Sequence, residues 1–114
     1  MQPNRQKLEA ARAFYLHPIL LCFEAEALIG LGRLDEAERT LDEALSHAQQ
    51  SGCCWWDPEL HRTRAMLASE AGDAARSREE LLRAIAIAEV QGSEAMRRRA
   101  VYDLAGMRDK GANN

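Results

Sequence analysis

The chain has 114 residues, 46% apolar and 29% charged, with a formal net charge of -3. This is the composition of one ordinary soluble domain. The slightly acidic balance argues against a general nucleic-acid or anionic-membrane binder, which needs a strongly basic surface. No apolar run reaches the ~18 residues of a membrane span. Because residues 1–7 lead into a mixed-charge segment and not into the apolar core of a signal peptide, we expect a cytoplasmic protein.

Helices are the only elements that the apolar spacing predicts, and we find no strand signal. In chain order we expect them at approximately 4–15, 18–31, 34–50, 58–71, 74–91 and 93–109. The segment 34–50 shows the pattern best, with one apolar stripe at steps of three and four. Its members are Leu34, Ala37, Leu41, Ala44, Leu45 and Ala48.

Glycine, proline and capping residues set these predicted bounds. Gly32 and Gly72 stand where a helix takes its left-handed stop. Asp73 and Ser93 can cap the helices that follow them, and Asp57 can do so ahead of a proline at the first helical position. The pairs His17-Pro18 and Asp57-Pro58 therefore mark the starts of the second and fourth helices.

The sequence repeats with a period of 40 residues. The matching pairs are Pro18 and Pro58, Leu20 and Leu60, Ala25 and Ala65, Gly32 and Gly72, Leu41 and Leu81, Ala44 and Ala84, Ala48 and Ala88, and Gly52 and Gly92. A fixed period in this range is typical of a stacked helical array. We expect a single domain, 1–114, made of units at about 18–57 and 58–97, a partial unit 98–114 and a partial helix 4–15.

Small residues within each unit resemble the tetratricopeptide repeat. They are Ala25, Gly32, Ala37, Leu41 and Ala44 in the first unit, and Ala65, Gly72, Ser77, Leu81 and Ala84 in the second. The stretch from Gly32 to Ala37 resembles that repeat's turn between helices. The resemblance implies an all-α, right-handed tetratricopeptide-like array of about six helices, with two full units and a capping helix.

A narrower resemblance covers about residues 15–108 and concerns the C-terminal repeat region of large bacterial signalling ATPases, which include transcriptional activators and proteins with adenylate-cyclase domains. Its carriers are residues 55–62, 83–88, 91–92, 99–100 and 104–105. It implies a regulatory module that binds partners. No phosphate-binding loop accompanies it, so the ATPase and cyclase activities are not carried over. We expect no enzyme activity and no cofactor.

Tetratricopeptide arrays bind extended peptides on a groove formed by the first helix of each unit. Transferring those positions gives Cys22, Glu26, Ile29, Arg62, Met66, Ser69, Arg99 and Tyr102 as the partner-binding groove. This mixture suits a peptide with polar and apolar anchors. The alternatives are that many of these residues form a solvated helical face, or that the groove takes a small effector molecule.

Other residues favour structural roles. Adjacent Cys53 and Cys54 are too close for an ordinary disulfide, so reduced thiols are expected, as for Cys22. Together with His47 and His61 they lack the spacing of a zinc site, and we expect no metal. Of Trp55 and Trp56, at least one should close the core.

Partners are expected to be proteins or peptides, including a second copy of the chain. The basic run 97–99 lacks aromatic residues to stack bases, so we expect it to solvate a capping face and to bind no nucleic acid. The apolar residues near the N-terminus have no comparable basic run to solvate them; they are Leu8, Phe14, Tyr15 and Leu16. A homodimer would therefore form through the N-terminal helices, and no membrane partner is expected.

Overall fold

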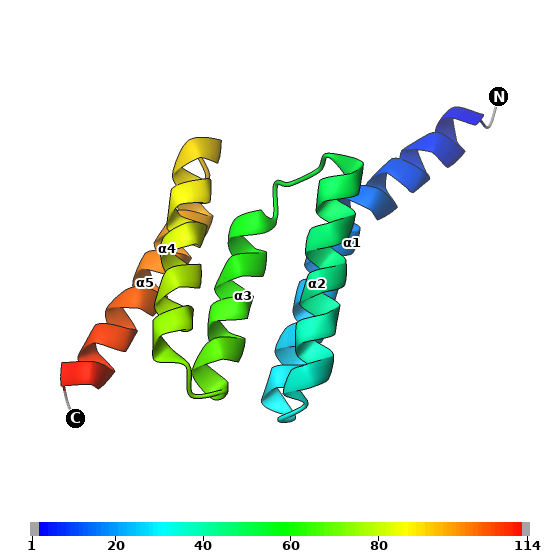
Figure 1. Ribbon diagram of the computed structural model, residues 1–114. Helices are drawn as coiled ribbons and strands as arrows, with labels where there is room; N and C mark the ends of the chain where they lie inside the picture. Colours follow the sequence, from blue (N-terminus) through cyan, green and yellow to red (C-terminus); the bar gives the residue numbers. More distant parts are fainter. Residues whose placement is uncertain (1–2, 113–114) are drawn as a thin grey trace.

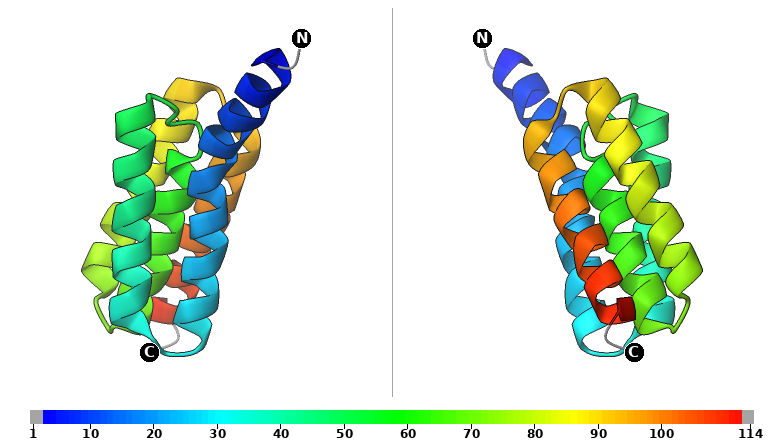
Figure 2. Two further views of the ribbon diagram at one scale, coloured as in Figure 1. Left: turned by 90° about the vertical axis from the view of Figure 1, so that its right-hand side faces the viewer. Right: turned by 90° about the vertical axis from the view of Figure 1, so that its left-hand side faces the viewer.

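The structure, a computed structural model, describes the backbone of residues 3–112 and the side-chain surroundings of residues 16–107. Within this part of the chain every regular element is a helix, as the sequence predicts: α1 (Pro3–Gly30), α2 (Leu34–Ser51), α3 (Asp57–Glu70), α4 (Ala74–Gln91) and α5 (Glu94–Ala112). Figure 1 shows consecutive helices running in opposite directions. In Figure 2, α2 and α4 form one side of the molecule, α1 and α5 the other, and α3 lies between them.

The first helix differs from the prediction. Two helices, 4–15 and 18–31, were expected to meet at Pro18, but α1 is continuous from Pro3 to Gly30, so the described chain has five helices and not about six. A proline inside a helix removes one backbone hydrogen bond and crowds the carbonyl four residues earlier, although its fixed φ angle is itself helical. Pro18 is fully buried, so its ring contributes to the packing of α1 at this point. The early part of α1 extends beyond the body of the molecule (Figure 1).

The other helix ends follow the sequence closely. Gly32 and Gly72 adopt φ angles of 77° and 82°, the left-handed conformation expected of them. Asp73 caps α4, since its carboxylate accepts a hydrogen bond from the backbone N–H of Arg76 at 3.0 Å. The cap predicted at Asp57 is wrong, because α3 begins one residue early and Asp57 lies in its first turn.

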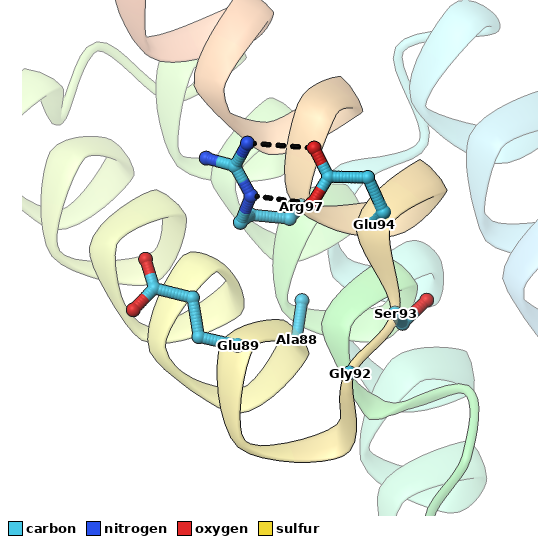
Figure 3. A pocket seen from close by; sticks show the side chains of 6 residues that line it. All are labelled: Ala88, Glu89, Gly92, Ser93, Glu94 and Arg97. Carbon is cyan, nitrogen blue, oxygen red and sulfur yellow. Dashed lines mark hydrogen bonds and ion pairs between the residues drawn. The ribbon is translucent and has the colours of Figure 1, made fainter.

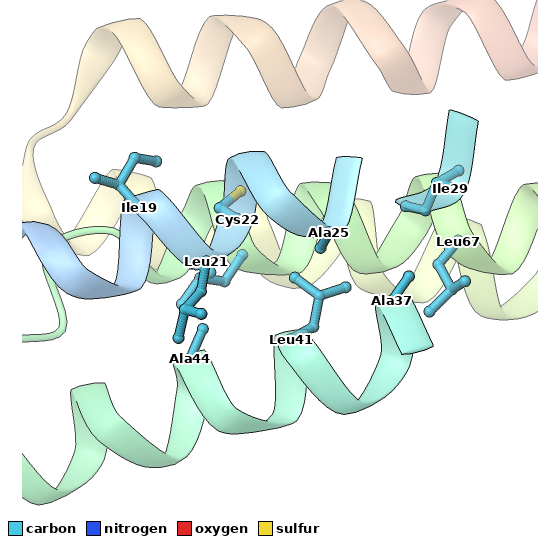
Figure 4. Close-up of a cluster of buried hydrophobic side chains, with 10 residues drawn as sticks. Ile19, Leu21, Cys22, Ala25, Ile29, Ala37, Leu41, Ala44 and Leu67 are labelled. Carbon is cyan, nitrogen blue, oxygen red and sulfur yellow. The ribbon is translucent and has the colours of Figure 1, made fainter. Parts of the chain in front are cut away.

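Two apolar clusters hold the helices together. The larger joins α1 and α2 to Leu60 and Leu67 of α3, and Figure 4 shows Leu67 beside side chains of α1 and α2. The smaller joins Ala65 of α3 to α4 and α5. The stripe predicted in 34–50 is confirmed, because Ala37, Leu41, Ala44 and Ala48 are almost fully buried, while Leu34 and Leu45 pack against the first cluster.

Helix α3 packs against every other helix, whereas α1 and α5 pack against α3 but, within the described residues, not against each other. This leaves a trough with α3 as its floor. Within the described residues, no helix is long and apolar enough to cross a membrane.

Candidate functional site

The trough contains a cavity of about 390 Å³. Five of the eight side chains predicted for the groove line it: Ile29, Arg62, Met66, Ser69 and Tyr102. The remainder of its wall comes from α3, α4 and α5, including Ala65, Leu81 and Met107 of the smaller apolar cluster. The sequence reasoning did not name the α4 contribution, because it transferred positions only from the first helix of each unit.

The cavity has an apolar base and an open, polar rim. Ala65 and Leu81 are buried at its base, and Met66 is partly buried beside them. Ser69, Glu70 and Tyr102 are exposed around it, with Tyr102 79% exposed. An exposed aromatic ring above an apolar floor is the arrangement that commonly anchors a bound side chain.

Arg99, the sixth predicted residue, lies beside this cavity and not inside it. It lines a neighbouring hollow of about 370 Å³ together with Arg98 and three residues shared with the main cavity, Arg62, Tyr102 and Asp103. The two hollows are therefore continuous around Arg62, Tyr102 and Asp103. This gives the trough a more basic end at the start of α5.

Cys22, predicted to line the groove, lies in the core beneath it. It is 1% exposed, and its Sγ is 3.0 Å from the Thr63 hydroxyl. Burial, reinforced by the carboxylates of Glu26 and Glu59 and opposed by the Thr63 hydrogen bond, raises the pKa of the thiol to about 11. The thiol therefore stays protonated near neutral pH and is a packing group, not a nucleophile.

Arg62 is the centre of an ionic cluster that joins three helices. Its guanidinium donates to Glu59 of its own helix at 2.9 Å, to Asp103 of α5 at 3.0 Å and to Glu26 of α1 at 3.4 Å. Burial alone would lower its pKa, but the carboxylates of Asp103 and Glu59 reverse this and raise it. Arg62 is only 8% exposed, so it acts mainly as a tie between the two walls of the trough.

Arg99 completes the cluster from the basic end. Its Nη1 lies 3.0 Å from Oε1 of the buried Glu59, an ion pair whose alignment falls outside hydrogen-bond geometry. Together the carboxylates of Glu26, Glu59 and Asp103 face two guanidinium groups. This leaves one excess negative charge at the centre of the trough. The sequence alone could not predict the cluster, because its members come from three helices, α1, α3 and α5, whose side chains meet only after folding.

A second buried pair lies away from the trough. His61 Nδ1 is 2.7 Å from the Glu80 carboxylate, and both residues are buried. Burial favours a raised pKa for Glu80, but the hydrogen bond and charge of His61 outweigh it and hold the pKa below its usual value. This pair links α3 to α4.

The residues weighed for a metal site lie apart in the structure. His61 pairs with Glu80, the ring of His47 lies 4.6 Å from that of His17, and Cys54 donates to the Ala48 carbonyl at 3.6 Å. In the part of the chain with described side chains, no three histidine, cysteine or acidic residues gather as metal ligands would.

A further hollow of about 360 Å³ lies where α4 turns into α5 (Figure 3). Arg97 donates to both carboxylate oxygens of Glu94, and Arg98 donates to one of them at 3.0 Å. These hydrogen bonds lower the pKa of Glu94 to about 2. The first two arginines of the basic run are therefore paired within their own helix.

The two tryptophans have different surroundings. Trp56 packs against the larger apolar cluster, as predicted for at least one of them. Trp55 is 39% exposed beside the turn that precedes α3.

Comparisons with known proteins give one informative similarity. The chain is 38% identical over 88 residues to an uncharacterized protein of Rhizobium meliloti (strain 1021). This match covers 76% of the chain but only 9% of the relative's length. No family model and no solved structure matches the chain. A segment similar to this chain thus forms a small part of a much longer protein in that bacterium.

Proposed function

We propose that the chain is a non-catalytic, tetratricopeptide-like scaffold that binds a protein or peptide segment in the trough between α1 and α5. The observation that carries the proposal is the cavity above α3, which has an apolar base and presents Tyr102 almost fully exposed at its rim. An extended segment can lie along such an open trough, with its apolar side chains on the base and its backbone near the polar rim.

The regulatory setting of this proposal comes from the resemblance to the repeat region of bacterial signalling ATPases. The similar segment in Rhizobium meliloti occupies 9% of a long protein, as a partner-binding region within a large regulator would. The right-handed array is part of the same proposal. The left-handed glycines at Gly32 and Gly72, and again at Gly52 and Gly92, support it because the same turns recur at the same spacing.

Small-effector binding is a second candidate for the same site. The cavity volume, about 390 Å³, lies within the ~300–1,000 Å³ of known small-molecule pockets. The exposed rim favours a peptide segment over a small effector, since small molecules are usually held in sites that cover most of their surface.

The test is a displayed peptide library screened with the whole chain, followed by affinity measurements on the selected peptides. Tyr102→Ala should weaken binding about tenfold or more, because an exposed aromatic anchor is the commonest energetic centre of such a site. Val90→Ala is the matched control, since Val90 is 90% exposed and lies on α4 outside the trough. Peptides that bind Tyr102→Ala as tightly as the parent would contradict the proposed site. A library that yields no peptide, together with a metabolite that raises the melting temperature, would favour the effector.

A further inference from the structure

A glycine of α5 borders the cavity at a position where the protein's own packing does not require one. Gly106 lies one turn after Tyr102 and lines the same cavity. A β-carbon there would have no neighbouring atom within 4 Å, and Gly106 is not among the glycines with positive φ. Glycine destabilises a helix interior relative to alanine, but it lets another backbone approach closely. Gly106 therefore marks a place where a bound segment has room to pass over α5.

Charge is balanced unevenly along the trough. At its basic end, the exposed guanidinium groups of Arg98 and Arg99 each hold a carboxylate already. At the other end, Glu70 is exposed on the rim of the cavity and has no ion pair among the side chains that the structure describes. An acidic group of a partner would have to compete with existing ion pairs, whereas a basic group would find a carboxylate that is not in use.

Helix ends add to the negative potential beside Glu70. Because consecutive helices alternate in direction, α1 and α3 both end on this side of the trough (Figure 1). The C-terminal end of a helix carries a partial negative charge, and neither helix has a basic residue in its last turn to offset it. The cluster around Arg62 already has one excess negative charge, so this end of the cavity favours a cation.

The apolar base and the acidic rim lie close enough for one short segment to use both. Met66 and Met107 line the base, and their flexible thioethers can adapt to apolar side chains of different shapes. The exposed ring of Tyr102 can cover the aliphatic stem of a lysine or arginine and attract its charge. All of these groups line one cavity of about 390 Å³, and an extended segment advances only about 3.3 Å per residue.

We propose that the segment bound in the trough carries a lysine or arginine within about two residues of its apolar anchor. The anchor lies on the cavity base, the cation lies at the rim on Glu70 and the ring of Tyr102, and the backbone passes over Gly106. This inference rests on the proposed function, since it assumes that a segment binds in the trough. It adds the chemical class of that segment, which is apolar and basic.

Two displayed peptide libraries test the charge of the segment. Both contain one fixed apolar position, and its flanking positions are restricted to lysine and arginine in one library and to aspartate and glutamate in the other. The whole chain should select binders mainly from the basic library. Glu70→Lys should weaken these peptides about tenfold and Glu70→Gln about threefold, because attraction is reversed in the first variant and only removed in the second. Glu79→Lys is the control, since Glu79 is exposed on α4 outside the cavity.

Gly106→Leu tests the path of the backbone. The new side chain should occupy the space over α5 and weaken every selected peptide about tenfold or more, whatever its charge. The melting temperature should stay the same or rise, because leucine favours a helix more than glycine does and meets no neighbouring atom at its β-carbon. Ala105→Leu is the control, since Ala105 is exposed on the same helix but does not line the cavity.

The outcomes separate this inference from the function on which it rests. Equal yields from the two libraries would overturn the inference while the trough remains the binding site. The same holds for peptides that are weakened by Tyr102→Ala but bind Glu70→Lys or Gly106→Leu as tightly as the parent. Peptides that none of these variants weakens, or two libraries without a binder, would overturn the proposed function and the inference with it.

Discussion

Arg62 shows how a residue expected to meet a partner can be occupied by the fold itself. The sequence predicts it on the groove wall, and it does line the cavity. Its guanidinium, however, is already held by carboxylates from α1, α3 and α5. A bound segment would therefore meet its aliphatic stem and the surrounding acids, while the exposed ring of Tyr102 remains available for contact.

Arg62→Ala should lower the free energy of unfolding by about 3 kcal/mol, because it leaves Glu59 buried without its closest cation. Arg62→Lys should restore only part of this loss, since one ammonium group cannot reach three carboxylates in the same geometry. Urea denaturation measures both variants. Arg98→Ala is the control, because the Arg98 side chain is 75% exposed, and it should change stability by less than about 0.5 kcal/mol. Equal effects of Arg62→Ala and Arg98→Ala would mean that the cluster does not stabilise the fold.

The His61 and Glu80 pair predicts a dependence of stability on pH. The pKa of Glu80 is lower in the folded chain than its ordinary value of 4.5, so ionised Glu80 stabilises the fold above that pH. This contribution is lost as the pH falls below about 4.5 and Glu80 takes up a proton. The parent should therefore be more stable than Glu80→Gln at pH 6, and the difference should shrink between pH 4.5 and pH 3. Urea denaturation at each pH measures it, and a difference that is constant over this range would rule out the coupling.

Local signals predicted α2, α3 and α4 well, because a glycine, a proline or an acidic residue stands within a turn of most of their ends, whereas α5 begins one residue later and ends three residues later than predicted. Helix α4 has the predicted bounds, and α2 is one residue longer than predicted. Pro18 misled the prediction for α1, since whether a proline ends a helix or only bends it depends on tertiary packing. Tertiary packing also explains why the sequence predicts Cys22 on the groove wall although it lies in the core. Its position in the core depends on Thr63, which lies 41 residues away.

Small residues at the helix contacts give a prediction for whole elements. Ala25 of α1 is 0% exposed in the larger apolar cluster, and Ala65 of α3 is 2% exposed in the smaller one. Ala25→Leu or Ala65→Leu should overpack these contacts and lower the free energy of unfolding by about 1–3 kcal/mol. Ala86→Leu is the control, because Ala86 is an exposed alanine in the interior of α4. Thermal melting compares the three variants. If the buried and the exposed substitutions lowered the melting temperature equally, the assignment of Ala25 and Ala65 to the helix contacts would be wrong.

The molecule as a whole is elongated. Its Cα radius of gyration is 15.6 Å, larger than the ~13 Å expected of a compact domain of this length. Its larger apolar cluster lies among α1, α2 and α3 and its smaller one among α3, α4 and α5, so α3 supplies residues to both. In stacked arrays, cooperativity depends on such contacts between neighbouring units, since distant units do not touch. The contacts of α3 therefore decide whether the chain unfolds in one step or two.

Leu81→Ala tests this coupling. Leu81 is 2% exposed in the smaller cluster, and its truncation should lower the free energy of unfolding by about 2–5 kcal/mol. Trp56 reports on the other cluster, against which it packs. Because α3 joins the clusters, the denaturation midpoint followed by tryptophan fluorescence should fall by the same amount as the midpoint followed by circular dichroism. Both midpoints are measured on the same samples. A fluorescence transition that stays at the parent's midpoint while the helical signal shifts would show that the two clusters unfold independently.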